Sequence, residues 1–275
     1  MENKKALEMV REDGFNLEYI ENQTEEICLE AVKECGYALQ YVKNQTEEIC
    51  LEAIKQEPYA LQYVKNQTKE MCLEAVKRNG YVLQYVKNQT KEICLAAIKQ
   101  NGLALYYVKN KTSEMCLEAV KQRGYALRYI ENQTEEMCLE AVKRNGLALE
   151  YVENQTQEIC LEAVKENGRA LEFVKSQLEE ISIEAVRVNK ESLVYVDNLI
   201  MNNLISKGVL EYKFLKQGDD SREVSAYKFE GEWYFFVGCQ MAISKEQFID
   251  KIYNEDGGLE ENPHRQHYLD FLAAI

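Results

Sequence analysis

Three side chains near the end of the chain carry groups that nucleophilic catalysis or zinc binding would require. Cys239 supplies a thiol, and His264 and His267 supply two imidazoles in a His-x-x-His spacing. A catalytic cysteine needs a base that a third group orients, and the sequence identifies no such group. The histidine pair lacks the remaining ligands of a zinc site. We therefore predict no catalytic residue, no metal and no cofactor, and an enzyme built on this C-terminal region is the least favoured alternative.

Seven of the nine cysteines form a second candidate group, because they recur every 22 residues, at Cys28, Cys50, Cys72, Cys94, Cys116, Cys138 and Cys160. Neighbouring packed helices lie about 8–10 Å apart, whereas a disulfide needs Cα atoms within about 7 Å. The same separation argues against a zinc ion shared by neighbouring cysteines. The column predicts small buried side chains in a reducing compartment, so we expect a cytoplasmic protein, in the host cytoplasm if the chain is viral.

A third motif, Asn-x-Thr, recurs with the same period and matches the acceptor sequence of N-glycosylation. It stands at Asn22, Asn44, Asn66, Asn88, Asn110, Asn132 and Asn154. The first residues contain no apolar signal segment, so we expect none of these sites to be modified. Helix capping is the structural alternative, with the side-chain oxygen supplied by either Asn22 or Thr24.

These motifs belong to one repeating unit. The ten-residue block Thr24–Lys33 returns from Thr46, Thr68, Thr90, Thr112, Thr134 and Thr156. Its apolar residues, Ile27, Cys28, Ala31 and Val32, share one helical face and predict an amphipathic helix. Gly36 is expected to end this helix in the left-handed conformation, and Tyr37–Val42 predicts a second, shorter helix.

Two short helices per unit predict an all-α solenoid of 22-residue two-helix repeats over residues 1–200, with nine units and degenerate ends that act as caps. A leucine-rich repeat is the competing fold, because Leu39-x-Tyr41-x-x-Asn44 imitates its strand signature. Ala, Glu, Lys and Leu dominate the first half of each unit and favour helix, so we prefer the solenoid.

Beyond residue 201 the period stops and a small α+β domain is predicted to fill residues 201–275. Val209–Lys216, Glu223–Phe229 and Glu232–Val237 are rich in aromatic and β-branched residues, which predicts a three-stranded antiparallel meander. A capping box at Ser244 and an Asn-Pro pair at Asn262 predict two helices after it.

The stretch Gly36–Tyr41 reads Gly-Tyr-Ala-Leu-Gln-Tyr, and each unit also carries Ala-Val-Lys, as at Ala31–Lys33 and Ala75–Lys77. This pattern resembles a family of tandem short helical repeats, found in bacteria and giant viruses, that is catalogued as a domain of unknown function. The resemblance covers roughly Ala6 to Asn198. It implies helical repeats and no catalytic residue.

Charge is unevenly distributed along the chain, whose net charge is −14. Gln67–Gly124 holds 10 Lys and Arg against 5 Asp and Glu, whereas Met1–Asn66 holds 7 against 14 and Tyr125–Leu199 holds 8 against 15. The basic excess comes from Lys69, Arg78, Lys91, Lys111 and Arg123. These residues predict a docking patch for an acidic partner, although a solvated helix face is the stronger alternative.

Aromatic residues supply a second candidate surface. Tyr37, Tyr59, Tyr81 and Tyr125 share one position of the repeat, at which Leu103, Leu147 and Arg169 also occur. Because the position accepts different residues, we expect it to lie on an exposed binding face.

We therefore predict a non-enzymatic, macromolecule-binding repeat protein that serves as a protein–protein interaction scaffold. The alternative is a viral or phage inhibitor of a nucleic-acid-handling defence enzyme, an anti-CRISPR-like mimic of nucleic acid, because acidic side chains recur in a row at Glu26, Glu48, Glu70, Glu92, Glu114, Glu136 and Glu158. The expected partner is another protein, including a nucleic-acid-binding enzyme, and direct binding of nucleic acid is the weaker prediction. No membrane contact is expected, because the longest apolar run, Trp233–Val237, is far shorter than a membrane span.

Overall fold

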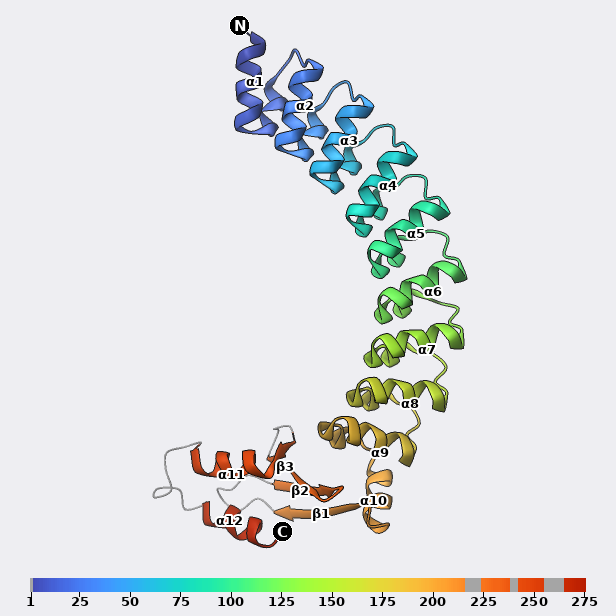
Figure 1. Cartoon of the computed structure of the whole chain (residues 1–275), viewed down its shortest axis with the longest axis vertical. Coiled ribbons are helices and arrows are strands. Elements are labelled where there is room, and N and C mark those ends of the chain that lie inside the picture. The colour runs from blue at the N-terminus through green and yellow to red at the C-terminus, as the bar shows by residue number, and fades with distance from the viewer. Residues whose placement is uncertain (1, 216–223, 238–241, 255–264) are drawn as a thin grey trace. The chain divides into compact units, whose positions relative to one another are not determined.

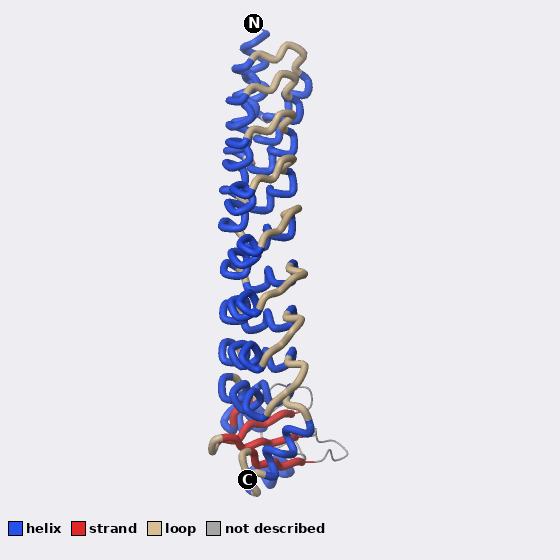
Figure 2. Tube along the Cα trace, turned by 90° about the vertical axis from the view of Figure 1, so that its right-hand side faces the viewer, coloured by secondary structure: helices blue, strands red, loops and turns tan. Residues whose placement is uncertain are grey.

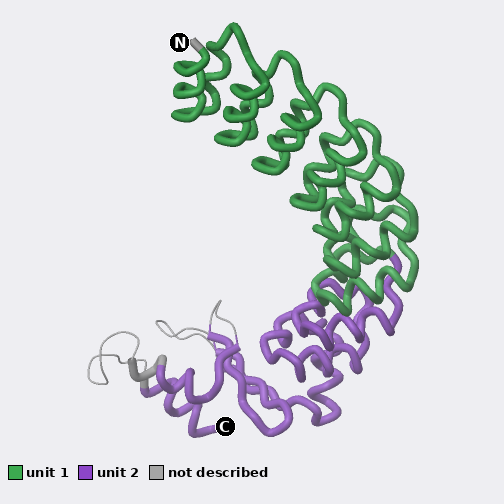
Figure 3. Tube along the Cα trace, turned by 45° about the horizontal axis from the view of Figure 1, so that its top comes forward, with its two compact units in different colours: residues 1–153 green, residues 154–275 purple. Residues whose placement is uncertain are grey.

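The computed structural model of the chain describes residues 2–215, 224–237, 242–254 and 265–275 (Figure 1). The chain divides into two compact units, residues 1–153 and 154–275 (Figure 3). Unit 1 contains helical repeats alone, and unit 2 contains further repeats followed by a small β-sheet with two helices. The predicted fold class, an all-α solenoid of 22-residue helix pairs followed by a small α+β region, is confirmed.

Unit 1 alternates α-helices with 3₁₀-helices, one of each per repeat. Its α-helices are α1 (Glu2–Glu12), α2 (Glu25–Glu34), α3 (Glu47–Gln56), α4 (Lys69–Arg78), α5 (Lys91–Gln100), α6 (Ser113–Gln122) and α7 (Glu135–Arg144). Its 3₁₀-helices are η1 (Gly14–Tyr19), η2 (Gly36–Tyr41), η3 (Pro58–Tyr63), η4 (Gly80–Tyr85), η5 (Gly102–Tyr107), η6 (Gly124–Tyr129) and η7 (Gly146–Tyr151). Successive α-helices pack against one another, and the turns that join the repeats follow one another along one side of the stack (Figure 2).

Helices α2 to α7 each begin after a threonine, which identifies threonine rather than asparagine as the cap. Thr24 Oγ1 accepts a hydrogen bond from the Ile27 N–H at 3.3 Å, and the same contact recurs at α3 to α7. The predicted apolar face is buried in every case, as Ala31 and Val32 show with no exposed surface. Acidic residues in the first turn and a lysine in the last interact favourably with the helix dipole and stabilise the helix.

The glycine after each α-helix has a different role from the one expected. Gly36 starts η2 without adopting the left-handed conformation, which among the described glycines only Gly208 and Gly231 adopt. A Cβ atom at Gly36 would lie 2.5 Å from the carbonyl oxygen of Ala53 in the next repeat. The expectation of a left-handed helix end was therefore wrong, and glycine stands here because the backbones of two repeats approach closely.

Unit 2 opens with two further repeats and ends in a four-stranded sheet. Its elements are α8 (Gln157–Glu166), η8 (Gly168–Phe173), α9 (Glu179–Val188), η9 (Lys190–Tyr195), α10 (Asn198–Ser206), β1 (Leu210–Leu215), β2 (Val224–Phe229), β3 (Glu232–Val237), β4 (Ile243–Ser244), α11 (Lys245–Asn254) and α12 (Arg265–Ala273). All neighbouring strands are antiparallel in the order β1-β2-β3-β4, with Ala226 opposite Phe235. The two-residue strand β4 extends the meander beyond the three strands that the sequence indicates.

One face of this sheet carries the core of the C-terminal region. Val224, Ala226 and Phe235 pack with Phe248 of α11 and Phe271 of α12, and the rings of Phe235 and Phe248 stack with centroids 4.5 Å apart. Both helices therefore cover the same face of the sheet, because strand residues two apart point to one side.

Within unit 2, the β2–β3 hairpin docks on the last repeat. Arg187 of α9 pairs with Glu230 at 3.0 Å, and the Lys190 ammonium lies 4.7 Å from the centre of the Phe229 ring. Lys190 occupies the position that is glycine in most repeats. No further repeat follows it among the residues that the structure describes, and its side chain contacts the β2–β3 hairpin instead. No helix in the described ranges combines the length and the apolar character that a membrane crossing requires.

Candidate functional site

A column of glutamines joins each repeat to the next. Gln45 Nε2 donates to the carbonyl oxygen of Tyr63 at 2.9 Å and to that of Leu39 at 3.4 Å. Its Oε1 accepts from the Lys65 N–H at 2.9 Å and from the Cys50 thiol at 3.9 Å. One carboxamide thus satisfies backbone groups of two repeats, and we call this arrangement the glutamine staple. It recurs at Gln23, Gln67, Gln89 and Gln133 in unit 1 and at Gln155 and Gln177 in unit 2.

Sequence reasoning missed the staple although its signal was visible. The glutamine is the middle residue of the Asn-Gln-Thr tripeptide, which attracts attention as a glycosylation motif. In the structure Asn44 is exposed, Thr46 caps α3, and Gln45 between them is half-buried. The repetition of the tripeptide therefore reflects packing between repeats.

A second column, the lysine ladder, runs beside the staples. Lys43 Nζ donates to the carbonyl oxygen of Glu21, 22 residues earlier, at 2.9 Å. Lys65, Lys87 and Lys109 repeat the contact with the preceding member of the column, at 3.0, 2.8 and 3.5 Å. The ladder fixes a row of ammonium groups along the turns of unit 1.

Both columns are interrupted at the same place, between the turn that holds Lys109–Thr112 and the turn that holds Glu131–Thr134, which we call the Lys111 junction; the staples resume at Gln133. Lys111 stands where the staple glutamine is expected, and Glu131 stands where the next ladder lysine is expected. Within the described part of the chain, no side chain hydrogen-bonds to the Tyr129 carbonyl or to the Glu131 N–H, the two atoms that a glutamine at position 111 would reach.

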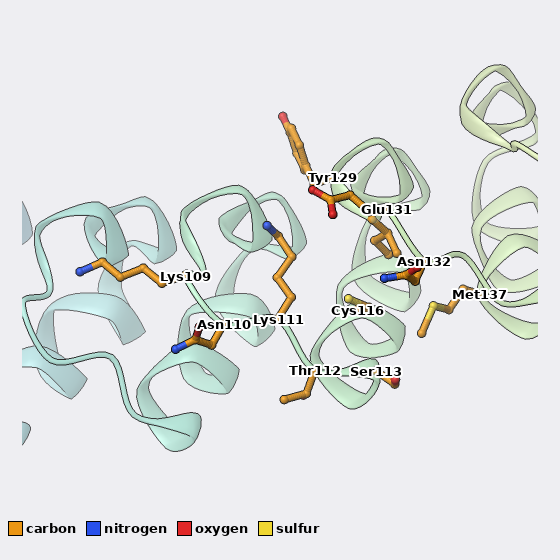
Figure 4. A pocket seen from close by; sticks show the side chains of 11 residues that line it. Lys109, Asn110, Lys111, Thr112, Ser113, Cys116, Tyr129, Glu131, Asn132 and Met137 are labelled. Atoms are coloured by element: carbon orange, nitrogen blue, oxygen red, sulfur yellow. The ribbon is translucent and has the colours of Figure 1, made fainter.

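A cavity of about 450 Å³ opens at the Lys111 junction. Lys109 and Lys111 of one turn, Tyr129 and Glu131 of the next, and Cys116 of α6 line it, and in Figure 4 the Lys109 side chain extends away from the other labelled side chains. Burial raises the pKa of the Cys116 thiol, and the Lys111 ammonium opposes that shift. A second cavity of about 490 Å³ lies one repeat earlier and is lined by Lys87, Lys91 and Lys109 among others. Lysines therefore line two adjoining cavities in the middle repeats.

The five predicted basic residues fall into two groups. Lys69 and Lys91 each form an ion pair with a glutamate of the following repeat, Glu92 and Glu114, the second at 2.5 Å. Arg78 donates to Glu74 at 2.6 Å and to the Lys55 carbonyl oxygen at 3.1 Å. These three residues each form a contact between neighbouring repeats of unit 1.

The other two are differently placed. Lys111 lines the cavity, and Arg123 is exposed immediately before η6. The ladder lysines Lys87 and Lys109, which also line the cavities, were not among the predicted residues, because a residue shared by many repeats does not stand out as a local excess of charge.

The predicted tyrosines pack between repeats. Tyr37, Tyr59 and Tyr81 are half-buried, Tyr125 is 37% exposed, and each meets a tyrosine of the following repeat edge to face, with ring centroids 6.0–6.3 Å apart. Edge-to-face pairs of this kind stabilise the stack.

A more exposed aromatic side chain borders the Lys111 junction. Tyr106 is 60% exposed, and its ring centroid lies 5.1 Å from that of Tyr129. The Arg128 guanidinium lies 5.3 Å from the centre of the Tyr129 ring. Two aromatic rings and a guanidinium group therefore flank the cavity. Tyr106 stands at the repeat position that is glutamine at Gln84, and sequence reasoning did not select it.

The thiol–imidazole group cannot be assembled from the described residues. Cys239 and His264 lie outside them, and His267 is exposed on α12. Within the ranges that the structure describes, no three His, Cys, Asp or Glu side chains form a group able to hold a metal ion.

Comparison with known proteins identifies the repeats. The model of the family described as Domain of unknown function (DUF4116) matches eight overlapping stretches, residues 5–45, 24–69, 46–91, 68–112, 90–134, 112–157, 134–179 and 156–201. The searches of curated proteins and of solved structures return no match. Each matched stretch spans two successive 22-residue repeats, so the family pattern includes the junction that the glutamine staple bridges. The chain belongs to the DUF4116 family of tandem repeats.

Proposed function

We propose that this chain is a non-catalytic scaffold that binds an acidic surface of a partner protein along the turns of its middle repeats, Gln67–Gly124. The observation that carries the proposal is the pair of adjoining lysine-lined cavities in unit 1. A repeat array presents the same positions at regular intervals, which suits it to binding an extended segment of another macromolecule.

Charge supports this choice of surface. The middle repeats hold 10 Lys and Arg against 5 Asp and Glu, in a chain whose net charge is −14. The lysine ladder orients Lys87 and Lys109 before any partner arrives, so less side-chain freedom is lost when it binds. A local positive potential of this kind attracts acidic groups and speeds their association at low ionic strength.

The same charges favour a protein over a nucleic acid. A nucleic-acid strand carries a negative charge on every nucleotide, and the stretch Met1–Asn66 before the basic repeats holds 14 acidic against 7 basic residues. Such a strand would be repelled where it left the basic segment. An acidic protein segment can end where the basic repeats end.

The test is affinity capture from the source cell with quantitative mass spectrometry, using the full chain and two double variants. Lys109→Glu with Lys111→Glu reverses two charges in one turn, and Lys77→Glu with Lys99→Glu makes the same net change within the same stretch, Gln67–Gly124. Lys77 and Lys99 lie in the last helical turns of α4 and α5. Lys109 and Lys111 lie instead in the loop that joins two repeats. We expect the first variant to lose an acidic partner at least about tenfold and the second to keep it. Equal recovery by both variants would contradict the proposal.

A further inference from the structure

We propose that the Lys111 junction binds a primary carboxamide, namely the side chain of a glutamine or asparagine in the acidic segment of the partner. The inference rests on the proposed function, because it specifies the chemistry of one residue in the segment that the lysine-lined turns bind.

The chain itself shows how such a group is bound at the preceding junction. Gln89 Nε2 donates to the Tyr107 carbonyl oxygen at 2.9 Å, and its Oε1 accepts from the Lys109 N–H at 3.0 Å and from the Cys94 thiol at 3.9 Å. The five staples of unit 1 use equivalent backbone atoms, 18 and 20 residues after the glutamine. The junction between two repeats is thus shaped for a carboxamide.

At the Lys111 junction the equivalent atoms belong to Tyr129, Glu131 and Cys116, and all three residues line the cavity of about 450 Å³. A lysine ammonium has only donors, so it cannot accept a hydrogen bond from the Glu131 N–H or from the thiol. In Figure 4 the Lys111 side chain extends away from Cys116. The residues that carry the carbonyl acceptor and the amide donor, Tyr129 and Glu131, therefore line a cavity from which the Lys111 side chain extends away.

The two backbone groups select among polar ligands. A carboxamide offers an acceptor to the Glu131 N–H and a donor to the Tyr129 carbonyl, as Gln89 does one repeat earlier. A carboxylate offers only acceptors, and its second oxygen would face the Tyr129 carbonyl oxygen. A leucine side chain would leave both groups without a partner, which costs free energy when water is displaced.

The charges around the cavity define the surroundings of that carboxamide. Lys109 and Lys111 lie on one turn and favour acidic neighbours, whereas the Glu131 carboxylate lies on the next turn and disfavours them. The preferred segment has its acidic residues on one side of the glutamine.

The test measures binding of two fluorescent peptides to the full chain by anisotropy. One peptide is fluorescein-Glu-Glu-Gln-Gly-N-methylamide, and the other has leucine in place of glutamine, so that only the first carries a primary carboxamide. Lys111→Gln and Lys111→Met remove the same charge, but only the first supplies the chain's own carboxamide. We expect the wild-type chain and Lys111→Met to bind the glutamine peptide about fivefold more tightly than the leucine peptide, and Lys111→Gln to lose that preference.

The outcomes separate this inference from the docking surface. Equal affinity of the wild-type chain for both peptides, or the same preference in both variants, would overturn the carboxamide site. If that equal binding weakened with salt, the acidic docking surface would still stand. A glutamine preference that did not respond to salt or to charge reversal at Lys109 would uphold the carboxamide site and overturn the docking surface.

Discussion

Gln45 Oε1 accepts a hydrogen bond from the backbone N–H of Lys65 at 2.9 Å, across the junction between two repeats. The same side chain donates to the Tyr63 carbonyl oxygen at 2.9 Å, so one residue hydrogen-bonds to both a backbone acceptor and a backbone donor of the following turn. Because backbone polar groups that are buried need partners, the staple contributes to stacking together with the apolar faces of the helices.

Replacing Gln45 with leucine should destabilise unit 1 by about 2–3 kcal/mol, because the Tyr63 carbonyl and the Lys65 N–H lose their partner. Urea unfolding followed by far-ultraviolet circular dichroism measures the change. Asn44→Ala is the matched control, since Asn44 is the exposed neighbour in the same tripeptide, and we expect it to change stability by less than about 0.5 kcal/mol. Similar losses in the two variants would show that the staple does not stabilise the junction.

Lys111→Gln should stabilise the chain by about 1 kcal/mol, because it restores a hydrogen-bonding residue at the interrupted position. Lys111→Met removes the same charge without supplying a carboxamide, so it separates the staple from the loss of repulsion among lysines. Differential scanning calorimetry should show a rise of about 2–4 °C in Tm for the glutamine variant relative to the methionine variant. Equal melting temperatures would be inconsistent with a restored staple.

Gly36→Ala should cost about 1–3 kcal/mol, the usual range for overpacking, because the new Cβ would lie 2.5 Å from the Ala53 carbonyl oxygen and 2.8 Å from the Glu57 Cβ. Pro58 occupies the equivalent position one repeat later, so the neighbouring backbone can shift to admit a larger residue. Gly208→Asn is the informative comparison. Gly208 has φ +69° and open space around it, and asparagine tolerates that conformation, so we expect a smaller loss. A milder effect at Gly36 than at Gly208 in thermal unfolding would contradict the close-approach explanation.

The sequence predicted the α-helices and their buried faces because a 22-residue period and an amphipathic pattern are both local signals. It could not specify that the second helix is a 3₁₀-helix, because residues three and four apart share a face in either form over six residues. The role of Gly36 was misjudged because its constraint comes from Ala53 in another repeat. Lys111 was noticed for its charge, yet its significance depends on backbone contacts 18–20 residues away, which no local pattern reveals.

Stability should fall at alkaline pH because of the buried thiols. Burial, followed by the Glu47 carboxylate, raises the pKa of Cys50 from 9.0 to about 11, while Lys65 opposes the shift. The unfolded chain then loses this proton near pH 9 and the folded chain only near pH 11. The stabilisation by the neutral thiol is therefore complete below pH 9 and is lost as the pH rises toward 11.

Cys50→Ser tests this linkage, because Ser182 occupies the same position in the last repeat and lies 3.5 Å from Gln177 Oε1. A hydroxyl does not titrate in this range. The variant should lose less stability than the wild-type chain between pH 9 and pH 11, with a difference of up to about 3 kcal/mol for two pH units. Parallel curves of urea midpoint against pH for the two proteins would rule out the thiol as the cause.

Hydrogen–deuterium exchange of the turn at residues 129–134 tests most directly whether Lys111 interrupts the glutamine staple. In the wild-type chain this turn should exchange faster than the equivalent turns at residues 63–68 and 85–90, where a glutamine binds the corresponding N–H. Lys111→Gln should slow the exchange to the rate of those turns, and Lys111→Met should not. Exchange at residues 129–134 that was already as slow as in the other turns of the wild-type chain would contradict the interruption.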